Sequence, residues 1–236
     1  MTSPADVGKR VLELAQEMAK DAEVRVDVVN GRSGNVRFAR NEITTSGDSG
    51  ELSISLWMGI GKRHAVVSTN QTDETSVREL AKRAVAMARL SPEDPESQPL
   101  LSPQKYESVP LSFDDRVATM GPGDRAAIAA RAVAQADREK VDVAGFFQRQ
   151  AWERALFSSS GLAATHRETK ATYTLTARTS DGTGSGWAGR ASHRIADIDD
   201  VALTKTAIDK GIRSAKPRGL PPGKYTVILE SPLGDP

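Results

Sequence analysis

The sequence predicts an α+β fold made of a duplicated helix–four-strand–helix unit with antiparallel or mixed sheets. Several segments alternate apolar and polar residues, which is the period of a half-buried strand. They are flanked by segments whose apolar residues recur at helical spacing. This order of elements recurs after about 118 residues, which indicates an internal duplication. A last segment, "PPGKYTVILE" at 221–230, predicts one more strand.

The first unit is expected at residues 1–110. A helix is predicted over 4–20, with Ser3 as its N-cap and Pro4 as its first residue. The Asn-Gly turn chemistry of "NGRSGN" predicts a hairpin between two strands, and "GIG" separates two more. A helix capped by Thr72 or Asp73 closes the unit. The four strands are expected in the ranges 23–29, 35–43, 51–58 and 62–70.

The second unit is expected at 111–220, after a proline-rich stretch at 91–110 that reads as a linker or a surface strap. It begins with an alanine-rich helix over 121–138 and ends with a capped helix over 197–215. A hairpin, a long strand and a short extended segment are predicted between the helices, in the ranges 141–150, 152–160, 164–178 and 190–198. Residues 221–236 form a third predicted region.

The loop "SDGTGSGWAGR" at 180–190 has the G-x-G-x-x-G spelling of a dinucleotide-binding motif. That motif needs a helix directly after the loop, because the helix N-terminus holds the phosphates. Here a strand is predicted to follow. The glycines therefore predict a long hairpin tip, the counterpart of the plain turn Met58–Gly61 in the first unit.

Composition excludes several classes of function. The net charge of +1 and the 5% of aromatic residues argue against a nucleic-acid partner. No run of about 18 apolar residues suggests a membrane span, and the N-terminus lacks the apolar core of a signal peptide, so we expect a cytoplasmic location and no membrane partner. The chain has no cysteine, so it lacks thiolate catalysis and cysteine-based metal sites.

No catalytic or metal-binding residue is predicted from the residues themselves. The histidines His64, His166 and His193 lack the spacing of a helical zinc motif, and we interpret His64 and His193 as strand histidines. Two tryptophans lie beside predicted turns, where they either cover the end of the sheet or line a groove for an extended peptide. The candidate peptide- or partner-contacting residues are Trp57, Gly59, Gly61, Gly184, Gly186 and Trp187.

Three stretches resemble the N-terminal half of the TldD/PmbA (TldE) family, often labelled "modulator of DNA gyrase". They are Ser53–Pro95, which contains "SISLWMGIGKRHAVVSTN", Ser158–Gly189, which contains "SSSGLAATHRETKATYTLTAR", and "PPGKYTVILE", which looks like the first strand of the family's β-rich C-terminal domain. The resemblance implies that residues 221–236 are the truncated start of that domain, the rest of which is missing from the chain. The family is regarded as zinc metalloproteases. Its TldD-like members carry H-E-x-x-x-H in a C-terminal domain, where histidines ligate zinc and the glutamate activates water. PmbA-like members lack this motif and pair with a TldD-like subunit to cleave peptides.

H-E-x-x-x-H does not occur in this sequence, so no catalytic residue is carried over and no cofactor is expected in this chain. The resemblance implies an N-terminal region that contributes subunit contacts and part of a peptide chamber without a hydrolytic centre, with the PmbA-like branch preferred. The implied partners are a peptide or unfolded-protein substrate and a second subunit, in a homo- or hetero-oligomer with a TldD-like protein. A truncated longer protein and a naturally short one both remain open. The alternative function is a non-enzymatic peptide-binding or scaffold module that uses exposed sheet edges.

Overall fold

The computed structural model describes residues 3–228 and has an α+β fold with one six-stranded sheet. The strand order is β3-β2-β1-β4-β5-β6, and the outer pairs β2–β3 and β5–β6 are antiparallel. The elements are α1 (Pro4–Met18), β1 (Glu23–Ala39), β2 (Glu42–Ile60), β3 (Arg63–Thr69), α2 (Glu74–Leu90), α3 (Asp115–Thr119), α4 (Pro122–Glu139), β4 (Val141–Ser158), β5 (Ala163–Thr179), β6 (Ser185–Ser192) and α5 (Asp200–Arg213), with short 3₁₀ turns at Pro110–Ser112 and Ile195–Asp197.

The expectation of four strands in each unit is wrong, because two predicted hairpins are single long strands. β1 runs straight through "NGRSGN", and the chain turns instead at Arg40 and Asn41, which both have positive φ. Gly31 lies inside β1 because the Trp152 ring occupies the place of a side chain at that position. β4 likewise continues through residues 150–152 without a turn. The observed order is therefore helix, three strands, helix, and it occurs twice along the chain.

By its contacts the chain divides into two compact units that are interleaved along the sequence. Unit 1 comprises 1–31, 50–110 and 152–167, and unit 2 comprises 32–49, 111–151 and 168–236. Each long strand therefore contributes one part to each unit. The consecutive ranges expected from the sequence follow the order of elements, and as domain boundaries they stay a prediction.

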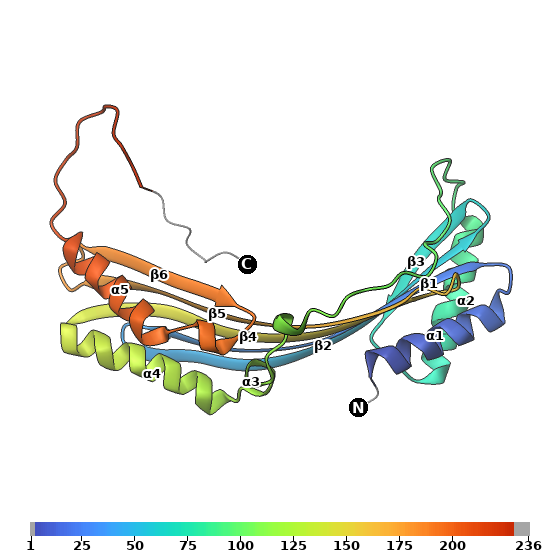
Figure 1. Ribbon diagram of the computed structural model, residues 1–236, viewed down its shortest axis with the longest axis horizontal. Coiled ribbons are helices and arrows are strands. Elements are labelled where there is room, and N and C mark those ends of the chain that lie inside the picture. The colour runs from blue at the N-terminus through green and yellow to red at the C-terminus, as the bar shows by residue number, and fades with distance from the viewer. Residues whose placement is uncertain (1–2, 229–236) are drawn as a thin grey trace. The chain divides into compact units, whose positions relative to one another are not determined.

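In unit 1, helices α1 and α2 cover one face of the strands (Figure 1). Ser3 and Asp73 cap these helices through their side chains, as the sequence predicts. Their apolar faces pack on alternate strand residues, which is why each strand shows a period of two in its burial. The buried strand residues are Val24, Val26, Val28, Ile54, Leu56, Met58 and Val67.

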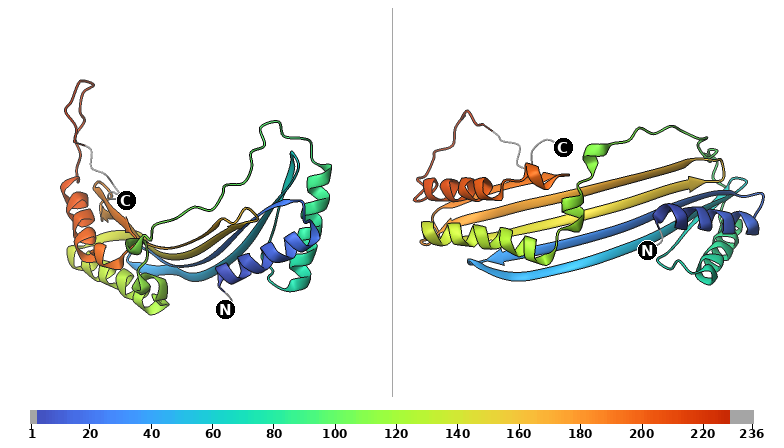
Figure 2. Two further views of the ribbon diagram at one scale, coloured as in Figure 1. Left: turned by 45° about the vertical axis from the view of Figure 1, so that its right-hand side comes forward. Right: turned by 60° about the horizontal axis from the view of Figure 1, so that its bottom comes forward.

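In unit 2, helices α4 and α5 cover one face of the strands (Figure 2). The core contains Val36, Phe38, Val143, Phe147, Tyr173, Leu175, Ala188 and Ile208. One polar contact lies inside it: the Tyr173 hydroxyl is 2.7 Å from Thr204 Oγ1, whose own proton is donated to the Asp200 carbonyl. Tyr173 is therefore the donor to Thr204. Burial raises the pKa of Tyr173 to about 12.

The proline-rich stretch lies along unit 1 as a strap without helix or strand up to Pro110. The Leu100 N–H donates to Glu23, and the Ser160 hydroxyl donates to the Leu101 carbonyl. No strand forms in residues 221–228, and Leu229 and Glu230 lie outside the described residues, so the expectation that this segment begins a further domain stays a prediction. Val227 and Ile228 are largely exposed, and a strand cannot form there without a hydrogen-bonded neighbour.

None of the helices within residues 3–228 is long and apolar enough to cross a membrane.

Candidate functional site

The face of the unit 2 strands that points away from α4 and α5 carries the candidate site; we call it the open face. Along β5, Tyr173, Leu175 and Ala177 are buried on the helix side, while Thr174 and Thr176 alternate with them on the open face. Trp187 on β6 pairs with Thr176, and Gly189 pairs with Thr174. The open face therefore combines one tryptophan with threonine hydroxyls.

A depression of about 360 Å³ lies on the open face. Its lining includes Arg37, Thr44, Phe146, Thr174, Thr176 and Trp187. The Arg37 guanidinium lies 4.8 Å from the centre of the Phe146 ring, a cation–π contact that holds the charged group over the sheet. Trp187 is 38% exposed, which is high for the largest apolar side chain. The arrangement offers aromatic surface, one cation and hydroxyl groups to a ligand.

Gly189 determines how the Trp187 ring lies on this face. A Cβ at Gly189 would lie 2.7 Å from the Trp187 ring, so any other residue would push the ring away from the strands. The indole consequently lies low over its own strand and leaves its outer surface exposed. An exposed aromatic with a fixed position is the kind of anchor that extended peptides use.

Gly184 and Gly186 face the opposite side and contact α5. A Cβ at Gly184 would lie 2.2 Å from the Gly211 carbonyl, and one at Gly186 would lie 2.2 Å from the Ala207 carbonyl. These glycines let the helix approach β6 closely, so their faces are occupied by the protein itself. The predicted long hairpin tip is also shorter than expected, because β6 already begins at Ser185 and includes Gly186, Trp187 and Gly189.

In unit 1, Trp57 on β2 is held between two neighbours. Its ring stacks on His64 with the ring centres 5.8 Å apart, and the Arg25 guanidinium lies 5.7 Å from the ring centre. The ring also fills the place of a side chain at Gly59. Gly61 has a φ of +59° in the turn to β3, where glycine is favoured. The predicted set thus divides between the units: Trp57, Gly59 and Gly61 lie in unit 1, and Gly184, Gly186 and Trp187 lie in unit 2.

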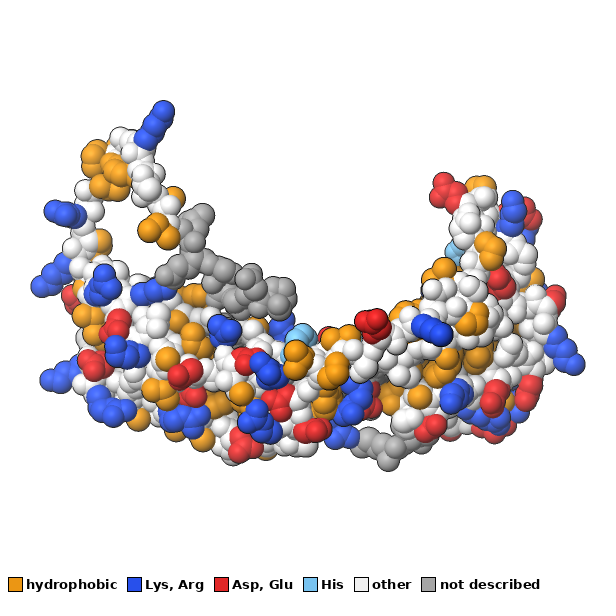
Figure 3. Space-filling view, viewed as in Figure 1, with side chains coloured by type: hydrophobic (Ala, Val, Ile, Leu, Met, Phe, Trp, Pro, Cys, Tyr) orange, Lys and Arg blue, Asp and Glu red, His pale blue; other side chains and the backbone are white. Residues whose placement is uncertain are grey.

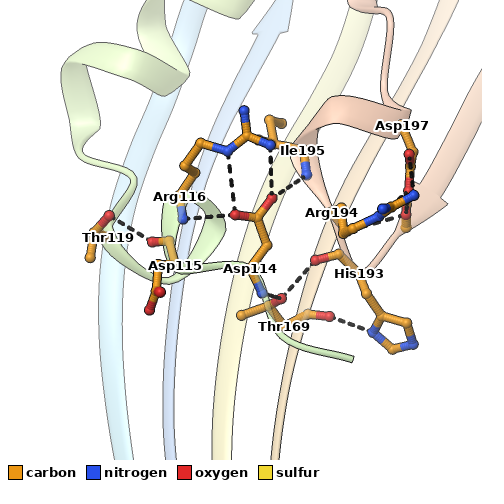
Figure 4. Close-up of polar contacts among 10 residues, drawn as sticks. Asp114, Asp115, Arg116, Thr119, Thr169, His193, Arg194, Ile195 and Asp197 are labelled. Atoms are coloured by element: carbon orange, nitrogen blue, oxygen red, sulfur yellow. Dashed lines mark hydrogen bonds and ion pairs between the residues drawn. The ribbon is translucent and has the colours of Figure 1, made fainter. Parts of the chain in front are cut away.

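His193 is part of a hydrogen-bond network that joins the end of β6 to the start of α3 (Figure 4). Its Nδ1 donates to the Thr169 carbonyl at 2.7 Å, and the Thr169 hydroxyl donates to the His193 carbonyl at 2.7 Å. The same hydroxyl accepts from the Asp114 N–H at 2.9 Å, and the Asp114 carboxylate accepts from the Ile195 N–H. Both of these His193 hydrogen bonds are made with Thr169, one through the ring and one through the histidine carbonyl, so they fix the end of β6 to β5. His193 lies one residue beyond β6, so its predicted position on a strand is wrong.

Within residues 3–228, no group of three or more histidine, aspartate or glutamate side chains lies close enough to hold a metal ion. On the face shown in Figure 3, basic and acidic side chains are interspersed and form no single-sign patch. This agrees with the near-zero net charge of the whole sequence.

The sequence and the fold both resemble one family of known proteins. Residues 22–88 match the family model "PmbA/TldA metallopeptidase domain 1". The predicted resemblance to the N-terminal region of the TldD/PmbA family is thereby confirmed. None of the curated protein sequences matches the chain.

Three solved structures share the fold. A candidate modulator of DNA gyrase from Thermotoga maritima superimposes with a TM-score of 0.80 at 14% identity, over 92% of this chain and 50% of its own. TldE from Thermococcus kodakarensis gives 0.78 at 17% identity, over 87% and 47%. A candidate modulator of DNA gyrase from Bacteroides thetaiotaomicron gives 0.75 at 16% identity, over 93% and 52%. The chain therefore spans about half the length of these proteins.

Some residues of the site were missed by the sequence predictions. The sequence predicts Phe146 and Arg37 only as parts of strands. Their contact joins β1 to β4, two strands about 100 residues apart in sequence. The alternation along β4 places Phe146 on the opposite face from the buried Phe147. An aromatic residue on the outward-facing side of a predicted strand is the signal in the sequence that could have identified Phe146 as a site residue.

Proposed function

We propose that this chain is the N-terminal region of a TldD/PmbA-type peptidase protein and that it binds extended peptide on the open face of unit 2. The observation that carries the proposal is the depression lined by Trp187, Phe146 and Arg37. Unfolded polypeptide offers apolar side chains, backbone carbonyls and carboxylates, which suit aromatic rings, hydroxyls and a guanidinium respectively. Hydrolysis itself would be carried out by another domain or subunit, with which this chain assembles.

Trp57 is a second proposed contact, since it alternates with the buried Leu56 and Met58 and so lies on the face of the unit 1 strands that points away from α1 and α2. It is more enclosed than Trp187, because Arg25 and His64 both contact its ring. Gly59 leaves room for the Trp57 ring, and Gly61 adopts the positive φ of the turn to β3. Gly184 and Gly186 lie against α5, so we restrict their role to packing and leave Trp187 as the main contact in unit 2.

A second candidate function is a scaffold that adds a strand at the β6 edge. The Ser185 N–H donates to Ser214 Oγ, and the Ser185 carbonyl lies 2.9 Å from the same oxygen. Both backbone groups of Ser185 therefore point away from β5. In an antiparallel pair this direction alternates, so the backbone groups of Trp187 and Gly189 also point outward. This edge could accept an extended segment by strand addition.

Replacing Trp187 with alanine is expected to weaken binding of an unfolded polypeptide, such as casein fragments, by about tenfold or more, because buried tryptophans dominate peptide contacts. Fluorescence anisotropy of a labelled fragment measures the Kd. The matched control is Val201→Ala, which removes an exposed apolar side chain from α5 in the same unit. Equal Kd values for wild type and both variants would rule out the open face as the binding surface.

A further inference from the structure

Two arginines are buried on the helix side of the unit 2 strands and share a single carboxylate; we call them the arginine pair. The Arg125 side chain, from α4, is 0% exposed, and that of Arg149, from β4, is 11% exposed. Arg125 Nη2 lies 2.6 Å from Asp48 Oδ2, and Arg149 Nη2 lies 3.2 Å from Asp48 Oδ1. Two positive charges thus face one negative charge in a site largely removed from water.

The arginine pair also has unused hydrogen-bond donors. Arg125 Nη1 donates to the Met120 carbonyl, but its Nε has no hydrogen-bond partner within residues 3–228. Among the same residues, Arg149 has no partner at Nε or at Nη1. Buried donors are almost always bonded in folded proteins, because leaving one unpaired costs the free energy of its lost hydration. The three unpaired nitrogens and the excess positive charge are both features of a site that binds a second anion.

Access to the pair is from the side of Asp48, which is 44% exposed. β3 pairs only with Ile54–Ile60 of β2, so the part of β2 that carries Asp48 is an outer strand of unit 2. Gly34 makes room for the ion pair, because a Cβ there would lie close to Asp48 Oδ1 and 2.5 Å from Arg125 Nη1. The N-terminus of α4, which begins three residues before Arg125, adds positive potential from the helix dipole.

We propose that the arginine pair binds a small oxyanion of carboxylate size beside Asp48, with Arg149 as its main ligand. A guanidinium presents its N–H groups in a planar fork that matches two carboxylate oxygens. Ordered water could satisfy the donors, but it would leave the excess charge uncompensated. The anion is either free in solution or carried on an acidic side chain, since both sources present the same carboxylate group. This site is independent of the open face and of peptide binding there.

Sodium formate is the probe that tests the site, in titrations against sodium chloride at equal ionic strength. Wild type is expected to show a saturable rise of Tm with formate only, because a ligand that binds the folded state stabilises it. Arg149→Gln is expected to weaken formate binding by about tenfold or more, measured by isothermal titration calorimetry. The matched control is Arg138→Gln, an exposed arginine of α4 that should respond like wild type. Equal effects of formate and chloride, or a full response in Arg149→Gln, would overturn the proposal.

Asp48→Ala gives a second, independent reading. Removing the carboxylate leaves both guanidiniums in place, so this variant is expected to bind formate more tightly than wild type and to regain part of its lost Tm. If it does not fold, the comparison of wild type with Arg149→Gln still decides. N-acetylaspartic acid amide separates the two sources: a response to formate alone supports a free anion, a response to both supports a side-chain carboxylate as well, and a response to neither contradicts the site.

Discussion

Replacing Asp48 with asparagine is expected to lower the free energy of unfolding by about 3 kcal/mol. The carboxylate is the ion-pair partner of both Arg125 and Arg149, which are 0% and 11% exposed, so its loss leaves two largely buried guanidiniums without their counter-charge. Asparagine keeps the size of the side chain but removes its charge, and its NH₂ group would face a donor. This loss of unfolding free energy lies at the low end of the range for a broken buried ion pair, because water reaches the Asp48 side chain. Chemical denaturation monitored by circular dichroism measures it.

The control for this change is Asp209→Asn, which removes an exposed carboxylate paired with Lys205 on α5. It is expected to change stability by about 0.5 kcal/mol or less. Equal stability of the two variants would show that Asp48 does not neutralise a buried pair.

The loss at Asp48 should also depend on pH. The hydrogen bond from Arg125 holds the pKa of Asp48 below its usual value of 3.8. The folded-state pKa is thus lower than the unfolded-state one, so this stabilisation is fully present above the unfolded value and is lost as the pH falls through the folded one. The stability difference between wild type and Asp48→Asn should therefore narrow in that acidic range.

Replacing Gly186 with alanine is expected to destabilise the fold by about 2 to 3 kcal/mol. The added Cβ would lie 2.2 Å from the Ala207 carbonyl oxygen and 2.3 Å from the Gly211 nitrogen, both in the backbone of α5. Because these atoms belong to a helix, they cannot rotate away as a side chain would, and α5 has to shift from β6. The free energy of unfolding measures the effect.

Gly47→Ala is the matched control, since it is also a strand glycine of unit 2 and a Cβ there would meet no atom within 4 Å. It is expected to change stability by about 0.5 kcal/mol or less. A Gly186→Ala protein as stable as Gly47→Ala would mean that the close contact between α5 and β6 is not needed.

Local patterns predicted the helices well, because helix caps and apolar spacing are local features. Ser3 and Asp73 cap their helices as expected, and α4 starts at the predicted Gly-Pro-Gly-Asp sequence. The strands were cut too short because Gly31 and Gly34 were read as turn residues. Gly31 instead makes room for Trp152, and Gly34 makes room for the contact between Asp48 and Arg125. These side chains are distant in sequence from the glycines. A local pattern cannot distinguish these two reasons for a glycine.

The candidate site was predictable in part. Trp187 is a candidate from the sequence because it lies beside a predicted turn, whereas its neighbours Arg37 and Phe146 depend on the pairing of distant strands. The arginine pair did leave a signal that was not used. Arg149 falls on the same alternating face as Val143 and Phe147, and Arg125 shares the apolar spacing of Ile128 and Ala129, so each is a charged residue at a core position.

Amide hydrogen exchange, measured with and without an unfolded casein fragment, tests most directly whether unit 2 binds extended peptide on its open face. The bound fragment is expected to slow exchange in 172–176 and 185–191, the segments of β5 and β6 that carry Thr174, Thr176 and Trp187. Added protection of the Trp187 and Gly189 amides would assign the binding to strand addition at the β6 edge. Unchanged exchange in both segments at saturating fragment would contradict the proposed function.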